Sequence, residues 1–215
     1  MSTRSATLGV RRMGRRTTAI PGQVSGLETD QEAWAALREG NEAALTVLFH
    51  RYADAVYNFA FRRTSSWAAA EDVVQATFTA LWRRARARKV DALQLESARP
   101  LLLVMAGYEC GNVLRSARRQ SALVGRLELV DRDGTEPDHS AAAVARVDDE
   151  RAMSAVRRIL DRIPAKQREV VELVVWADCS MAEAARALGV PEGTVKSRLN
   201  RARKSLLEFD TEGLV

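Results

Sequence analysis

The sequence predicts an all-α protein made of two small helical domains joined by a flexible linker. Apolar residues recur at three- and four-residue steps through two long parts of the chain, which is the period of an amphipathic helix. No segment shows the strict apolar–polar alternation of a half-buried strand. Between the two parts, over residues 120–146, the composition shifts to Gly, Pro, acidic and small residues, which is typical of a linker.

The first 28 residues have no apolar period, and we expect them to form a disordered basic tail. The chain has 215 residues and a formal net charge of +5, and this tail holds five arginines against one glutamate. Most of the net charge therefore lies outside the expected domains. Local clusters of charge must decide whether the folded part binds nucleic acid.

We expect the first domain to span residues 29–119. Its helical pattern starts at Asp30 and continues to Thr64, with Trp34, Leu37 and Leu48 among its apolar positions. A second helix is predicted to open near Ser66 and to run past Trp82. Pro100 suits the first turn of a third helix, because its fixed φ fits that position and its missing N–H has no partner to lose there.

The second domain is predicted over residues 147–210. Helical periodicity resumes at 147–164, and a further helix covers 165–179. Ser180 and Glu183 then form a capping-box pattern, which predicts the start of a short helix. Gly189 can end that helix in the left-handed conformation, and Pro191 suits the first turn of the next one. This order of helix, glycine turn and helix is the helix-turn-helix signature.

The last helix has two different faces. Val195, Leu199, Ala202 and Leu206 fall on one side and are expected to face the core. The other side is small, polar and basic, which suits entry into a DNA major groove; an ordinary solvated helix face is the alternative. The predicted DNA-binding residues are Glu192, Gly193, Thr194, Lys196, Ser197, Arg198, Asn200, Arg201 and Lys204.

Two segments resemble a known family. The segment "IPAKQREVVELVVWADCSMAEAARALGVPEGTVKSRLNRARKSL" resembles region 4 of the extracytoplasmic-function (ECF, group four) sigma factors of the sigma-70 family. The earlier segment "AEDVVQATFTALW" is similar to the part of sigma region 2 that docks on the clamp helices of the largest subunit of RNA polymerase. The resemblance implies that core polymerase contacts Asp72, Gln75, Phe78 and Trp82.

The resemblance also assigns roles to the third helix and to the connection before it. In the family this helix reads the −10 element of the promoter, which implies DNA contacts at Tyr108, Asn112, Arg115, Arg118 and Arg119. The usual Trp, Asn and Asp of the family are absent here, whereas the basic run suits phosphate contacts. The polar connection at about 86–98 corresponds to the loop that captures a base flipped out of the melted strand.

The resemblance thus implies a subunit that binds core RNA polymerase and directs promoter-specific initiation. Region 4 would read the −35 element as duplex, region 2 would hold melted −10 DNA, and an anti-sigma factor would be a partner. The alternative is a stand-alone helix-turn-helix regulator that binds operator duplex. The expected location is the reducing cytoplasm, because the two cysteines can build neither a disulfide framework nor a zinc site. No apolar run approaches the length of a membrane span.

We expect no catalytic activity, cofactor or metal. The sequence has no glycine-rich phosphate loop, no nucleophile elbow and only two histidines. Its two cysteines, Cys110 and Cys179, lie far apart in apolar contexts, so we interpret them as buried structural thiols.

Overall fold

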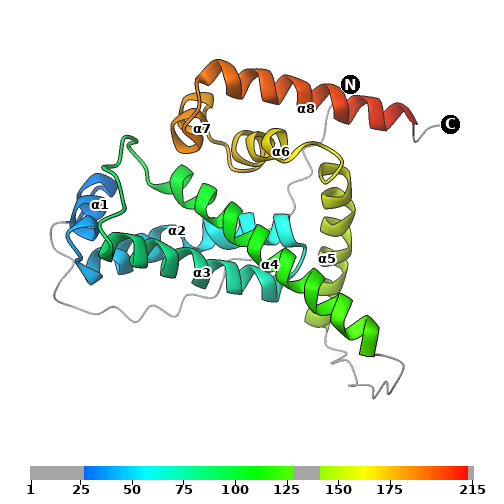
Figure 1. Cartoon of the computed structure of the whole chain (residues 1–215), viewed down its shortest axis with the longest axis horizontal. Coiled ribbons are helices and arrows are strands. Elements are labelled where there is room, and N and C mark those ends of the chain that lie inside the picture. The colour runs from blue at the N-terminus through cyan, green and yellow to red at the C-terminus, as the bar shows by residue number, and fades with distance from the viewer. Residues whose placement is uncertain (1–26, 128–140, 213–215) are drawn as a thin grey trace.

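The computed structural model describes residues 27–127 and 141–212, and every regular element in these ranges is a helix (Figure 1). The prediction of an all-α fold is therefore confirmed for this part of the chain. The expected tail at 1–26 and the middle of the expected linker, 128–140, lie outside the described residues.

The first predicted helix is in fact two helices, α1 (Asp30–Arg38) and α2 (Glu42–Thr64). The chain turns at Gly40, whose φ of 89° is open to glycine at little energetic cost. Asn41 then caps α2 by accepting a hydrogen bond from the backbone N–H of Ala43 at 2.9 Å. The single continuous pattern read from the sequence was wrong at this point, because both helices place their apolar residues on one shared core.

α3 (Trp67–Arg86) follows directly, with Ser66 at its N-cap as expected. α4 (Arg99–Leu127) starts one residue before Pro100, which lies in its first turn as predicted. α4 continues to Leu127 and α5 (Ala141–Leu160) begins at Ala141, so the stretch assigned to the linker is helical at both of its ends.

α1 to α4 pack as one bundle around a continuous apolar core. The largest fully buried side chains there include Leu37, Leu48, Val73, Leu81 and Leu102, each contributed by a helical position of the predicted period. The rings of Phe61 and Trp67 stack at 3.5 Å between centroids where α2 meets α3. Burial of these side chains supplies most of the stability of this bundle.

The carboxy-terminal part consists of α6 (Ala165–Val171), a π-turn (Glu172–Trp176), α7 (Met181–Leu188) and α8 (Glu192–Glu212). α6 and α7 both pack against α8, and α5 lies against α2 of the first bundle. Figure 1 shows α4 crossing the middle of the molecule, with α8 on one side of it and α3 on the other. The π-turn is a helical turn that contains one extra residue, and such turns are frequent at functional sites.

Candidate nucleic-acid and polymerase interface

The turn between α7 and α8 has the geometry that the sequence predicts. Ser180 Oγ accepts from the N–H of Glu183 at 3.2 Å, and the Glu183 carboxylate accepts from the N–H of Ser180 at 2.8 Å. These hydrogen bonds hold the pKa of Glu183 below its usual value, so the cap stays ionised and suits the positive end of the helix. Gly189 ends α7 with a φ of 64°, in the left-handed region.

α8 is held by one face and leaves the other open. Val195, Leu199 and Ala202 are buried against α6 and α7, as predicted, and Leu206 is half-buried. All nine predicted DNA-binding residues of α8 are exposed or half-buried. The hydroxyl of Ser197 donates to the carbonyl of Thr194 at 3.0 Å, within the helix itself. The longer basic side chains of this face therefore extend furthest toward a partner. A helix seated in this way can enter a groove without disturbing its own core.

The four residues predicted to contact polymerase do not share one surface. Asp72 and Gln75 are exposed on α3 and Trp82 is half-buried. Phe78 lies in the core with 4% of its surface exposed, because the ring of Phe49 covers it. The two rings meet edge to face at 5.0 Å, and Phe49 keeps 37% of its surface exposed. The exposed aromatic ring of this face is therefore Phe49.

The predicted −10 residues lie along one stretch of α4, and Tyr108 is 65% exposed. Asn112 links two neighbours, donating to the Glu109 carboxylate at 3.0 Å and accepting from Arg115. Four of the five predicted residues line a cavity of about 420 Å³ between α4 and the helices that follow it, namely Tyr108, Asn112, Arg115 and Arg118. Arg119 is exposed next to them.

A buried ion pair joins the two parts of the molecule at one end of this cavity. Arg63 Nη1 on α2 lies 2.6 Å from Glu172 Oε2 in the π-turn, and Glu172 is only 1% exposed. Burial raises the pKa of Glu172 to about 7, and the positive charges of Arg63 and Arg168 offset part of that effect. The ion pair thus joins α2 to the π-turn across the boundary between the two parts.

Three further hydrogen bonds follow the same boundary. Arg62 donates to the carbonyl of Trp176 at 2.7 Å, and Trp176 is the last residue of the π-turn. Arg157 on α5 donates to the carbonyl of Thr64 at 3.2 Å, and the N–H of Trp67 donates to Glu150 at 2.9 Å. All four contacts involve the end of α2 or the start of α3. This junction is therefore one place where the carboxy-terminal helices attach, and α7 and the π-turn also pack against α4.

Sequence reasoning missed this junction because its partners are far apart in the chain. One local signal was present, a glycine in the middle of α4. A Cβ at Gly107 would stand 3.0 Å from Arg63 Nη1, so the glycine leaves room for the arginine to reach Glu172. Glycine inside a helix lowers its stability by about 1 kcal/mol relative to alanine, and the close approach of Arg63 gives Gly107 a structural reason.

The cysteines are buried, as predicted. Burial raises the pKa of Cys110 to about 12 and also raises the pKa of Cys179, so both thiols stay protonated and poorly reactive. Across 27–127 and 141–212 there is no group of three side chains that could hold a metal ion. In the same ranges no helix has the length and apolar character needed to cross a membrane.

The fold and its open faces define a class: a two-part helical protein with a carboxy-terminal helix-turn-helix. Two family profiles match the chain, "Sigma-70 region 2" over residues 48–120 and "Sigma-70, region 4" over residues 153–206. The ECF RNA polymerase sigma factor SigL of Mycobacterium tuberculosis is 31% identical over 170 residues, which cover 77% of this chain and 88% of SigL. SigM of the same organism is 30% identical over 179 residues, which cover 83% of each chain.

This chain belongs to the ECF group of the sigma-70 family. Among solved structures, that of CnrH in complex with the cytosolic domain of CnrY matches with a TM-score of 0.58 and 23% identity. The match covers 85% of this chain and 97% of CnrH, and it supports the same fold.

Proposed function

We propose that this chain is the promoter-specificity subunit of an RNA polymerase. The exposed side of α3, with Asp72, Gln75 and Trp82, would dock on the clamp helices of the largest subunit, together with Phe49 of α2. The basic face of α4 would bind melted −10 DNA, and α8 would enter the major groove at the −35 element. No catalytic group is required, because a protein that binds the melted state more tightly than the duplex shifts the equilibrium toward opening.

One observation carries this proposal beyond family membership. A single chain presents two separate polar surfaces, the small basic face of α8 and the row from Tyr108 to Arg119 on α4. A regulator that binds only duplex needs the first surface and has no use for the second. An aromatic ring that is 65% exposed beside several arginines suits an unpaired strand, since its bases can stack on the ring.

The proposal extends to partners and place of action. CnrH, which shares the fold, was solved with the cytosolic domain of CnrY bound to it. We infer that an anti-sigma factor likewise controls this chain, and that it acts in the cytoplasm, where polymerase meets DNA.

The test is run-off transcription with purified core polymerase and a pool of genomic promoter fragments, with and without this chain. Discrete new transcripts that depend on the chain are expected, and their start sites would give the −10 and −35 sequences. Duplex binding without transcripts would support the stand-alone regulator instead. Neither transcripts nor DNA binding would reject both functions.

A further inference from the structure

The segment between α3 and α4, residues 87–98, is held in place although it forms no helix. Only Leu95, at 3% exposure, is buried deeply in this part of the loop before Ala98. Such a short apolar anchor does not by itself fix the path of a twelve-residue connection. Val90 and Leu93 of the loop pack in part against the core. The loop also runs alongside α1 in Figure 1, and hydrogen bonds from that helix reach its backbone.

Three side chains of α1 bind the backbone of this loop. They are Asp30, Trp34 and Arg38, spaced four residues apart and therefore on one face of the helix. Arg38 Nε donates to the carbonyl of Val90 at 2.9 Å, and Trp34 Nε1 donates to the carbonyl of Asp91 at 2.9 Å. At the far end of the loop, the N–H of Ala98 donates to Asp30 Oδ2 at 2.7 Å.

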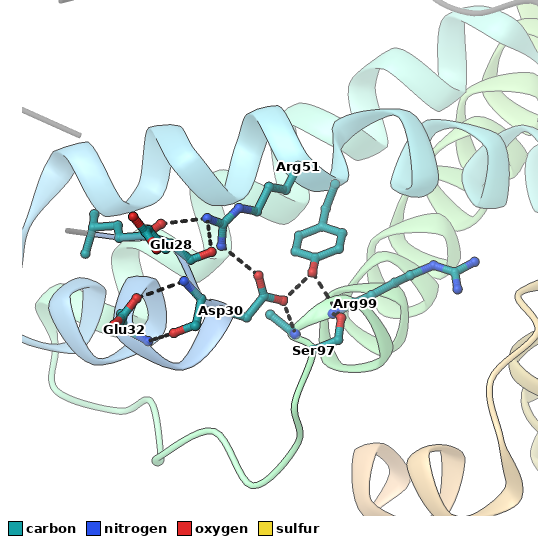
Figure 2. Close-up of polar contacts among 10 residues, drawn as sticks. Glu28, Asp30, Glu32, Arg51, Ser97 and Arg99 are labelled. Carbon is teal, nitrogen blue, oxygen red and sulfur yellow. Dashed lines mark hydrogen bonds and ion pairs between the residues drawn. The ribbon is translucent and has the colours of Figure 1, made fainter. Parts of the chain in front are cut away.

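The carboxylate of Asp30 is itself fixed by α2 (Figure 2). Arg51 forms an ion pair with Asp30 Oδ1 at 2.9 Å, and the hydroxyl of Tyr52 donates to Oδ2. That hydroxyl also lies 3.0 Å from Ser97 Oγ in the loop. Burial, and next the hydrogen bond to Asp30, raise the pKa of Tyr52 to about 12, so the hydroxyl remains a donor. The end of the loop is thus attached to two helices.

The three contacts from α1 go to backbone atoms, so they do not depend on which side chains the loop carries. Asp91, Gln94 and Glu96 remain exposed between the anchoring points. These groups can accept hydrogen bonds, and Gln94 can also donate, which suits the edge of an unpaired base. The loop thus presents polar side chains on a backbone that hydrogen bonds from α1 fix in position.

We propose that α1 is a clamp for this loop, and that Asp30, Trp34 and Arg38 are positioning residues for the reading of melted −10 DNA. The inference rests on the proposed function, because the loop reads a base only if the chain opens promoters. Flipping a base out of the stack is unfavourable, and a pocket that is already formed offsets more of this cost than a loose one. A loose loop would lose both affinity for the melted strand and discrimination between bases.

The test uses the full chain in complex with core polymerase. Arg38→Met removes the donor and keeps the apolar stem, whereas Arg38→Lys retains a donor. Trp34→Phe removes the indole N–H and keeps an aromatic ring. Gln31→Ala is the control, because Gln31 is exposed on the same helix. The probe is a set of bubble templates made from the promoters found by run-off transcription, in which each melted −10 position carries each of the four bases.

We expect Arg38→Met and Trp34→Phe to weaken binding to the preferred bubble about three- to tenfold, which corresponds to the loss of one net hydrogen bond. They should also flatten the base preference at one position. Arg38→Lys should retain the preference, and all variants should keep normal affinity for core polymerase and for −35 duplex. Faster amide hydrogen exchange at residues 87–98 would accompany the loss.

Faster exchange in the loop with unchanged base preference would overturn the positioning role, as would unchanged exchange and preference in Arg38→Met. If the unaltered chain neither starts transcription nor binds any bubble, the proposed function fails, and the role of α1 in DNA reading fails with it. If the unaltered chain is active and the variants match it, only the inference about α1 fails. The two failures are therefore distinguishable.

Discussion

Arg63 and Glu172 lie 109 positions apart in the chain, and their charged atoms meet at 2.6 Å in a buried site. The contact joins α2 to the π-turn and so connects the two parts of the protein. A buried pair of this kind contributes little net stability in its intact form, because both charges must be desolvated. Removal of one partner lowers stability more, since it leaves the other charge buried without a partner.

Arg63→Met should lower the free energy of unfolding by about 2–4 kcal/mol, because it leaves the Glu172 carboxyl buried without its nearest cation. Urea unfolding followed by circular dichroism measures the change. Arg83→Met serves as the control, because Arg83 is exposed on α3. Equal stability of the Arg63 and Arg83 variants would show that the ion pair is not formed in solution.

The contribution of Glu172 should depend on pH. Its pKa is about 7 in the packed protein and near the ordinary value of 4.5 when exposed. The packed state therefore binds the proton more tightly, so the stabilisation is complete below about pH 4.5 and is lost as the pH rises through 7. The charged or titratable groups around Glu172 are Arg63 of α2, Cys110 of α4, Asp161 after α5, and Arg168 and Glu169 of α6.

Glu172→Gln removes this titration and leaves the other groups in place. We expect the wild-type chain to gain stability relative to Glu172→Gln when the pH falls from 8 to 5.5. Melting temperatures of both proteins at the two pH values measure the difference. A constant difference between the two proteins would contradict the raised pKa.

Two glycines of α4 form a matched pair for testing the space around Arg63. Gly111→Ala should stabilise the protein by up to about 1 kcal/mol, because its Cβ would meet only Arg115 Nη1, at 3.5 Å. Gly107→Ala should lose this gain or reverse it, because its Cβ would push Arg63 away from Glu172. Thermal unfolding of both variants compares them directly. Equal stabilisation would mean that Arg63 moves aside freely.

Arg201→Ala should weaken binding to −35 duplex and reduce the slope of log K against log salt by about 1, if this arginine contacts one phosphate. Fluorescence anisotropy at several salt concentrations gives the slope. Arg84→Ala, which removes an exposed arginine from α3, should leave the slope as it was. A normal slope in Arg201→Ala would remove this residue from the proposed interface.

Asp72→Ala should reduce the affinity for core polymerase and leave the melting temperature within about 1 °C, because Asp72 is exposed and surface substitutions change stability little. Biolayer interferometry with immobilised core polymerase measures the affinity. The matched control is Asp54→Asn on α2, another exposed carboxylate. A large fall in melting temperature would instead assign Asp72 a structural role.

Local chemistry allowed the helix-turn-helix to be predicted from the sequence. Ser180, Glu183 and Gly189 act on atoms within a few residues of themselves, so their pattern could be read directly. The same kind of signal was present at Gly40 and Asn41, but the apolar period continued across the turn and concealed it.

The other features could not be read because they depend on packing. Phe49 and Phe78 both fit an apolar stripe, and only the packing of α2 on α3 decides which ring is covered. Arg63 and Glu172 each look like an ordinary surface charge in sequence. Their pairing depends on how α2 and the π-turn are placed, which no local pattern encodes.

The π-turn at 172–176 continues α6 directly and closes that helical segment. The N–H of Ala177 bonds to the carbonyl of Glu172, five residues back, so this turn contains one residue more than a regular helix needs. The extra residue widens the last turn of this helical segment, and the chain leaves the helix at Ala177. Glu172 thus acts at two places at once, because its carbonyl closes the wide turn and its carboxylate meets Arg63, so the residue that ends this helical segment also attaches it to the first bundle.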